Sequence, residues 1–120
     1  MSPMRLTTEN YKEGIASTSQ GVLFCFSELC HDCKIMKKII EMFSIQRRQA
    51  VLFKLDSAEE PQAIINLGIE RVPTILIIHD GLVVAAKTGF ITSRELTALF
   101  DGFSTNISAS PPREQMRKAT

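Results

Sequence analysis

Two cysteines, Cys30 and Cys33, lie where a strand-like run of the sequence gives way to a helix-like run. Residues 22–26 are continuously apolar, which is typical of a buried strand. After the pair, apolar residues recur at helical spacing while charged residues occupy the other positions. These apolar residues are Met36, Ile39, Ile40 and Phe43. The sequence therefore predicts a strand, a short loop and a helix that opens at the cysteines.

The position of this pair predicts redox chemistry. At a helix start, free backbone N–H groups and the helix dipole stabilise a thiolate. Residues i and i+3 share one helix face, with Cα atoms about 5–6 Å apart, so a disulfide can close between them. We expect Cys30 to be the nucleophile and Cys33 the resolving thiol. Asp32 is the nearest carboxylate able to move a proton from Cys33, and histidine is the side chain that, when unperturbed, changes charge near neutral pH, so Asp32 and His31 are both candidate participants.

Half of a zinc site is the structural alternative for the same pair. A closed zinc site needs four ligands. The two missing ligands would have to come from Cys25, His31, Asp32 and His79, and no second C-x-x-C occurs. Cys25 alternates with phenylalanines inside the predicted strand, so we expect a buried apolar thiol there. The redox interpretation is preferred, and no metal is predicted.

The length of 120 residues fits one domain, and the composition excludes several classes of protein. The net charge of +1 argues against nucleic acid or an anionic membrane as the main partner. No stretch approaches the roughly 18 apolar residues of a membrane span, and the N-terminus lacks a signal-peptide core. Three cysteines, an odd number, argue against a disulfide framework. We expect a cytoplasmic monomer, with a processed secretory form as the alternative.

The rest of the chain predicts alternating strands and helices. Thr7 or Thr8 is expected to cap a first helix, and strands are expected at 22–26, 50–55, 74–79 and 82–87. The helix at about 30–44 crosses between the first two strands, which implies that these run parallel. Asp80-Gly81 predicts an antiparallel hairpin between the last two.

Two further patterns predict helix starts. Ser57 to Glu60 and Thr92 to Glu95 each have the spacing of a capping box, and the helix after the first is expected to end near Gly68. Together the elements predict an α/β protein with a mixed central sheet and helices on both faces. Residues 1–103 form the predicted domain, and residues 104–120, with a Pro-Pro pair among small polar residues, the predicted flexible tail.

Several of these residues stand in the order found in the thioredoxin family. The cysteine pair after the first long strand, Val72-Pro73-Thr74 before the penultimate strand, Asp80-Gly81 and Gly89 resemble that family over roughly residues 5–103. The resemblance implies the thioredoxin fold and a thiol:disulfide oxidoreductase that reduces protein disulfides. It implies a cis-proline at Pro73 facing the disulfide. It also implies a substrate groove at Leu29, Val72, Pro73 and Gly89.

The resemblance also implies partners. We expect disulfide-containing protein substrates and electron transfer from a thioredoxin-reductase-like flavoprotein, with no cofactor on this chain. The sequence departs from the family in four ways: Leu29 replaces a tryptophan, Phe24 a buried aspartate, His31-Asp32 a Gly-Pro, and Lys38 a proline. Thiol chemistry is expected to survive these changes. A non-catalytic adaptor that binds partners through the same groove is the alternative function, because fold does not fix function.

Overall fold

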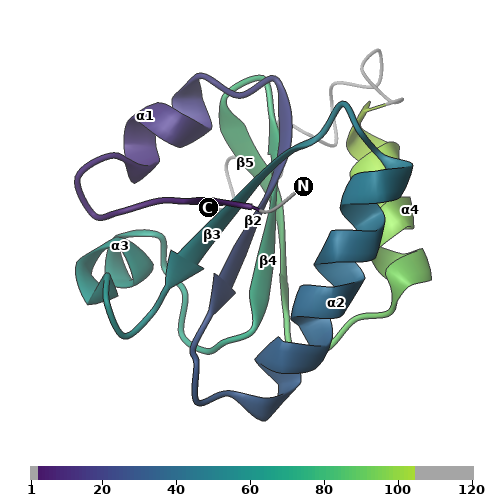
Figure 1. Cartoon of the computed structure of the whole chain (residues 1–120). Helices are drawn as coiled ribbons and strands as arrows, with labels where there is room; N and C mark the ends of the chain where they lie inside the picture. Colours follow the sequence, from purple (N-terminus) through teal and green to yellow (C-terminus); the bar gives the residue numbers. More distant parts are fainter. Residues whose placement is uncertain (1–2, 105–120) are drawn as a thin grey trace.

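A computed structural model describes residues 3–104, in which helices and strands alternate along most of the chain (Figure 1). Each strand predicted from the sequence, and the cysteine helix, forms to within two residues of its expected ends. The predicted tail begins at residue 104 and otherwise lies outside the described residues. The elements are β1 (Met4–Arg5), α1 (Tyr11–Ala16), β2 (Gln20–Phe26), α2 (His31–Gln46), β3 (Val51–Asp56), α3 (Pro61–Asn66), β4 (Thr74–His79), β5 (Leu82–Thr88) and α4 (Ser93–Ser104).

The strands form one mixed sheet in the order β1-β3-β2-β4-β5. β1 and β2 each pair in parallel with β3, whereas β4 is antiparallel to both β2 and β5. The α2 helix connects β2 to its parallel neighbour β3, as the crossover argument predicts. The predicted parallel pair and the predicted antiparallel pair are both confirmed.

Asp80 and Gly81 make the predicted turn between β4 and β5. Their φ angles are positive, 53° and 79°, which a two-residue loop needs to match the twist of its strands. A Cβ on Gly81 would lie 2.6 Å from the carbonyl oxygen of Ala16, so only glycine permits this approach to α1. The Gly81 N–H donates to the Thr18 carbonyl at 2.8 Å. The hairpin is thereby fixed to the loop that leads into β2.

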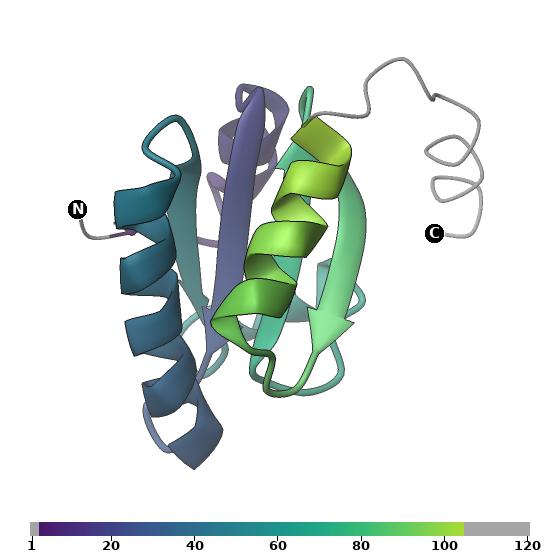
Figure 2. The ribbon, with the colours of Figure 1, turned by 90° about the vertical axis from the view of Figure 1, so that its right-hand side faces the viewer.

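Helices cover both faces of the sheet, with α2 and α4 on one face and α1 and α3 on the other (Figures 1 and 2). The alternation of side chains along β2 divides the core in two. Val22, Phe24 and Phe26 pack on the side of α2 and α4, whereas Leu23 and Cys25 pack on the side of α1 and α3. The predicted α/β architecture is confirmed.

Phe43 provides a test of how α2 is held on the sheet. Its side chain is fully buried and packs edge-to-face against Phe100 of α4, with ring centroids 5.1 Å apart. We expect Phe43→Ala to lower the free energy of unfolding by about 3–5 kcal/mol, because ring contacts are lost and a cavity remains. The adjacent Met42 is 55% exposed, so Met42→Ala should change the free energy of unfolding by no more than about 0.5 kcal/mol. Urea unfolding followed by circular dichroism measures both, and equal losses would contradict the assignment.

The starts of α3 and α1 differ from their predictions. The capping box expected at Ser57 to Glu60 is wrong, because Asp56 accepts the hydrogen bonds instead. Its Oδ1 accepts from the N–H groups of Ala58 and Glu59 at 2.8 and 3.3 Å. Helix α3 then begins at Pro61, which suits a first helical position because it has no N–H to leave unpaired.

The start of α1 also differs from its prediction, whereas the start of α4 agrees with it. The N-cap of α1 is Asn10, not Thr7 or Thr8. The Asn10 N–H donates to Thr7 Oγ1 at 3.2 Å and the Thr7 N–H to Asn10 Oδ1 at 2.7 Å, which closes a separate turn before the helix. At α4 the predicted capping box is confirmed, with the Glu95 N–H 3.1 Å from Thr92 Oγ1 and the Thr92 N–H 2.8 Å from Glu95 Oε1.

Strand β1 was not predicted from the sequence. It has only two residues, both exposed, and pairs with Phe53 and Lys54 at the sheet edge. A strand this short carries no alternation that a sequence pattern could reveal. None of the helices within residues 3–104 has the length and apolar character needed to cross a membrane.

Candidate active site

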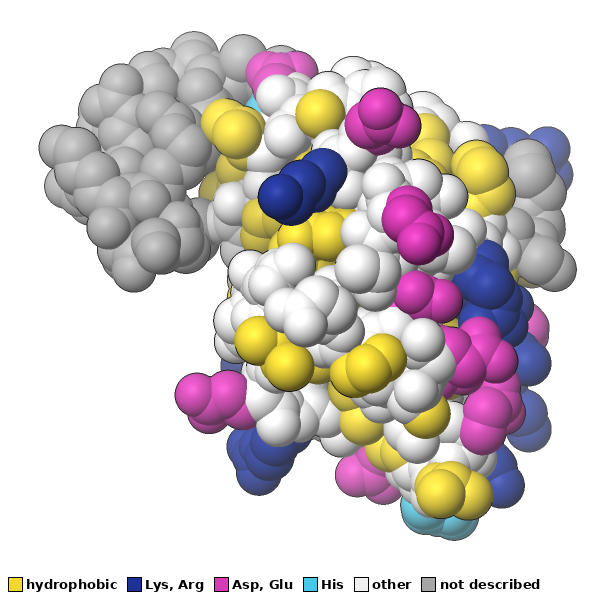
Figure 3. All heavy atoms as spheres, turned by 90° about the vertical axis from the view of Figure 1, so that its left-hand side faces the viewer, with side chains coloured by type: hydrophobic (Ala, Val, Ile, Leu, Met, Phe, Trp, Pro, Cys, Tyr) yellow, Lys and Arg dark blue, Asp and Glu magenta, His cyan; other side chains and the backbone are white. Residues whose placement is uncertain are grey.

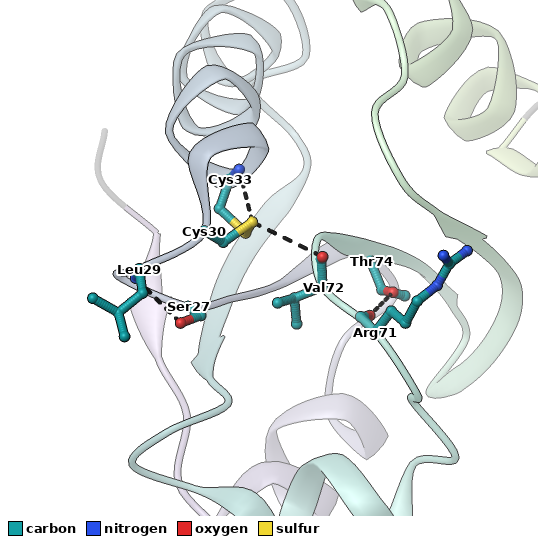
Figure 4. Close-up of a disulfide and its surroundings, with 7 residues drawn as sticks. All are labelled: Ser27, Leu29, Cys30, Cys33, Arg71, Val72 and Thr74. Carbon is teal, nitrogen blue, oxygen red and sulfur yellow. Dashed lines mark hydrogen bonds between the residues drawn. A yellow bond between two sulfur atoms is a disulfide. The ribbon is translucent and has the colours of Figure 1, made fainter.

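The start of α2 is organised around Cys30. After β2 ends, the Cys30 N–H donates to the Ser27 carbonyl at 3.1 Å and the Leu29 N–H to Ser27 Oγ at 3.2 Å, which makes a tight turn. Cys30 is extended and serves as the N-cap, with its Sγ accepting the Cys33 N–H at 3.1 Å (Figure 4). The sulfur thus occupies the place of the oxygen that usually caps a helix.

Cys30 and Cys33 are joined by a disulfide in the structure, with their Cα atoms 5.2 Å apart (Figure 4). The two cysteines differ in exposure. Cys33 is only 3% exposed and belongs to the core under α2, whereas Cys30 is partly buried and lies at its edge. A substrate can therefore reach Cys30 more easily, which supports its assignment as the nucleophile.

The loop before β4 brings Val72 against this pair. The Val72–Pro73 peptide bond is cis, and the Val72 carbonyl oxygen lies 3.9 Å from Cys30 Sγ while the Arg71 side chain points away (Figure 4). Two hydrogen bonds support the loop. The Gly89 N–H donates to the Pro73 carbonyl at 2.8 Å, and Thr74 Oγ1 donates to the Arg71 carbonyl at 2.6 Å. Val72, Pro73 and Gly89 are thus brought together beside the disulfide.

The two residues between the cysteines are exposed in the first turn of α2. Asp32 places a negative charge at the positive end of the helix dipole, which is favourable. Neither the His31 nor the Asp32 side chain makes a hydrogen bond or an ion pair with any residue between 3 and 104. Their roles in tuning the thiols and moving protons stay predictions.

Two residues that directly adjoin residues of this site in the sequence carry exposed apolar side chains. Leu29, directly before Cys30, is 96% exposed, although leucine side chains are usually buried. Phe90 is half exposed and follows Gly89, which hydrogen-bonds to the Pro73 loop. The sequence reasoning missed Phe90. Its signal was an apolar residue between a strand end and the Thr92 cap, where small or polar residues are common.

The third cysteine lies elsewhere. Cys25 is fully buried in β2 on the face covered by α1 and α3, and burial raises the pKa of its thiol to about 12. His79 is buried at the far end of β4, beside Asp80. No group of three or more potential metal-binding side chains forms within residues 3–104. The structure therefore does not bring together the ligands that the zinc alternative requires.

The Phe24 ring belongs to the same half of the core as Cys33. Phe24 is 4% exposed and stacks on Phe26, with ring centroids 5.4 Å apart. Its neighbour across the ladder is Lys54 on β3, which is partly exposed. The wall of the core next to the cysteines thus carries aromatic rings that cannot accept a proton.

The profile of the family described as Thioredoxin matches residues 2–101 of the chain. A thioredoxin of Buchnera aphidicola from the pea aphid is 29% identical over 100 residues, which cover 82% of this chain and 93% of that protein. The structure of reduced desulfothioredoxin from Desulfovibrio vulgaris Hildenborough is 35% identical, with a TM-score of 0.75 over 86% of this chain and all of that one. A mutant thioredoxin from Halobacterium salinarum, at 18% identity, shares the fold, with a TM-score of 0.78 over 85% of this chain and 90% of that one.

Proposed function

Because this chain belongs to the thioredoxin family and is a thiol–disulfide oxidoreductase, we propose that it reduces disulfide bonds in other proteins. One observation carries the proposal. The Cys30–Cys33 pair sits at the start of α2 with the more accessible sulfur beside the Val72 backbone. A reactive sulfur next to a stretch of loop backbone suits a substrate that is itself a peptide.

The reaction proceeds by two exchanges. The Cys30 thiolate attacks one sulfur of the substrate disulfide, and the other substrate sulfur leaves as a thiolate and takes a proton from water. Cys33 then loses its proton and attacks Cys30 Sγ, which releases the second substrate sulfur as a thiolate. The substrate gains two electrons and the protein is left with the Cys30–Cys33 disulfide.

The Val72 loop would position the substrate. Val72 makes no backbone–backbone hydrogen bond within the described part of the chain, so its N–H can pair with an extended peptide, while its carbonyl faces Cys30 Sγ at 3.9 Å. Pro73 offers no N–H and the Gly89 N–H is already used, which leaves Val72 as the pairing residue. Leu29 supplies an apolar contact on the opposite side of the pair.

A complete cycle needs a reductant, which we expect to be a thioredoxin-reductase-like flavoprotein acting on the oxidised pair in the cytoplasm. The alternative is an adaptor that binds partners without turnover. The 96% exposure of Leu29 suits that function too, since an exposed leucine can anchor a partner. The two functions differ in whether the cysteines cycle.

Insulin reduction by dithiothreitol, followed by turbidity, separates the two functions. The wild-type protein should shorten the delay before turbidity, and Cys30→Ser should remove the effect because no nucleophile remains. Cys25→Ala serves as the matched control and should retain it, since Cys25 lies in the other half of the core. Identical curves for the wild type and Cys30→Ser would refute the reductase proposal and favour the adaptor.

A further inference from the structure

A hollow of about 590 Å³ reaches Cys33 from under α2. Its inner wall contains Phe24, Phe26 and the Cys33 side chain, and Pro3 lies on its outer side. The start of the described chain is seen beside α2 in Figure 2. Phe24 and Phe26 both face this side of the sheet, away from Cys25. The hollow therefore connects solvent with the resolving cysteine at a place separate from the Val72 loop.

The charged residues of this hollow have an excess of lysine. Four lysines and two glutamates line it, namely Lys34, Lys37, Lys38, Lys54, Glu28 and Glu41. No lysine side chain among them makes an ion pair or a hydrogen bond with any residue in the range 3–104. In Figure 3, which views the side of α1 and α3, most acidic side chains lie along the right-hand edge, next to lysine and arginine side chains. We call this hollow, with its lysines from α2 and β3, the lysine hollow.

The chemistry of Cys33 gives the lysine hollow a role. Resolution of a mixed disulfide requires the Cys33 thiol to lose a proton, yet no carboxylate or imidazole within residues 3–104 hydrogen-bonds to Cys33. The nearby rings of Phe24 and Phe26 have no acceptor atoms. The two rings thus supply no base. The proton must pass to a carboxylate such as Asp32, Glu28 or Glu41, or to a base from solution that enters through the hollow, which leads to the thiol.

We propose that the lysine hollow binds a phosphate dianion, free or as a phosphomonoester, which acts as an exchangeable base for Cys33; this rests on the proposed dithiol function. Several ammonium groups suit a doubly charged oxyanion better than a carboxylate. A phosphate group also titrates near neutrality, which favours general-base catalysis there.

The step balances without a further reactant. The dianion takes the proton of the Cys33 thiol and becomes a monoanion. The Cys33 thiolate forms a bond with Cys30 Sγ, and the bond between Cys30 and the substrate sulfur breaks. The substrate leaves as a thiolate, which recovers a proton from the monoanion or from water.

Binding is tested first on the oxidised protein, where no turnover is needed. Inorganic phosphate is added at constant ionic strength, with chloride as the balancing anion, while amide NMR signals are recorded. The Phe24, Cys33 and Lys54 amides should shift to saturation. Lys34→Gln combined with Lys54→Gln should weaken binding several-fold, whereas Lys12→Gln on the exposed side of α1 should not. Shifts that grow linearly, or equally in both variants, would overturn the inference.

The base role is tested by the rate at which a preformed mixed disulfide on Cys30 releases its thiol at pH 7. Phosphate should raise this rate by about tenfold or more and then saturate. Sulfate has the same charge and shape but is hardly basic, so it should bind, fail to accelerate release and compete with phosphate. Phosphomonoesters such as glycerol phosphate should act like phosphate if the hollow admits them, and phosphate alone should act if it does not. Phosphate binding with no acceleration would overturn the base role.

Two comparisons keep the outcomes separate. Phe24→Asp would supply an internal carboxylate, so the rate of thiol release from this variant should lose its dependence on phosphate. Circular dichroism shows whether the variant folds. If it does not, the variant with both Lys34→Gln and Lys54→Gln tests whether release depends on phosphate bound in the hollow. Failure of the inference would appear as equal release in phosphate and chloride. Failure of the proposed function would appear as no release in any buffer.

Discussion

Cys33→Ser protein is expected to stay covalently attached to its substrate. The mixed disulfide on Cys30 is normally resolved by a thiol whose Cα is 5.2 Å away, so the attack is intramolecular. Without it, release depends on thiols from solution, and we expect the rate to fall by at least about 10³-fold because the advantage of proximity is lost. Mass spectrometry and non-reducing gels, after mixing reduced variant with a disulfide-containing protein, measure the adduct.

Cys30→Ser supplies the matched control. Its remaining thiol, Cys33, is 3% exposed and should form little adduct with the same substrate. Wild-type protein should pass through the adduct and end with the Cys30–Cys33 disulfide. If Cys30→Ser accumulated adduct and Cys33→Ser did not, the two roles would have to be exchanged.

Alkylation of the fully reduced protein should discriminate strongly between Cys30 and Cys25. Burial raises the pKa of Cys25 to about 12, so at pH 7 only about 10⁻⁵ of it is thiolate. An ordinary exposed thiol is about 3% thiolate at that pH. With access blocked as well, Cys25 should react with iodoacetamide at least about 10³-fold more slowly than Cys30.

Peptide mapping after a short exposure measures the label at each cysteine. Repeating the reaction in urea provides the control, because unfolding removes the burial that protects Cys25 and should bring its labelling close to that of the other cysteines. Rapid labelling of Cys25 in the folded protein would contradict its place in the core.

The predictions that succeeded rest on local patterns. The continuous apolar runs of β2 and β4, the Asp80-Gly81 turn and the Thr92 to Glu95 box are each decided within a few residues. The box at Ser57 failed because Asp56, one residue earlier, competes for the same N–H groups. Asp56 and Ser57 can both accept these hydrogen bonds. Which of them does so depends on how the chain leaves the end of β3, and the sequence pattern does not show this.

In the candidate site too, local features could be predicted from the sequence and long-range contacts could not. The pairing of Cys30 with Cys33 follows from helix geometry, but the contact of Cys30 with Val72 joins residues 42 positions apart. From the residues alone, no spacing rule places Val72 there; only the family resemblance did so. The lysine hollow needed both α2 and β3 in place, because Lys54 reaches it from a different element than the other three lysines.

The hydrogen bond from the Cys33 N–H to Cys30 Sγ links the chemical state of one sulfur to the order of a helix end. A thiolate is a strong, charge-assisted acceptor, so the first turn of α2 is held most firmly when Cys30 is ready to attack. Once Cys30 is bonded to a substrate, its sulfur is neutral and accepts more weakly. We therefore expect the turn carrying Cys33 to be held less firmly in the mixed disulfide, at the stage when Cys33 must advance on Cys30. On this expectation, each substrate, by reacting, weakens the hydrogen bond that holds the residue which later displaces it.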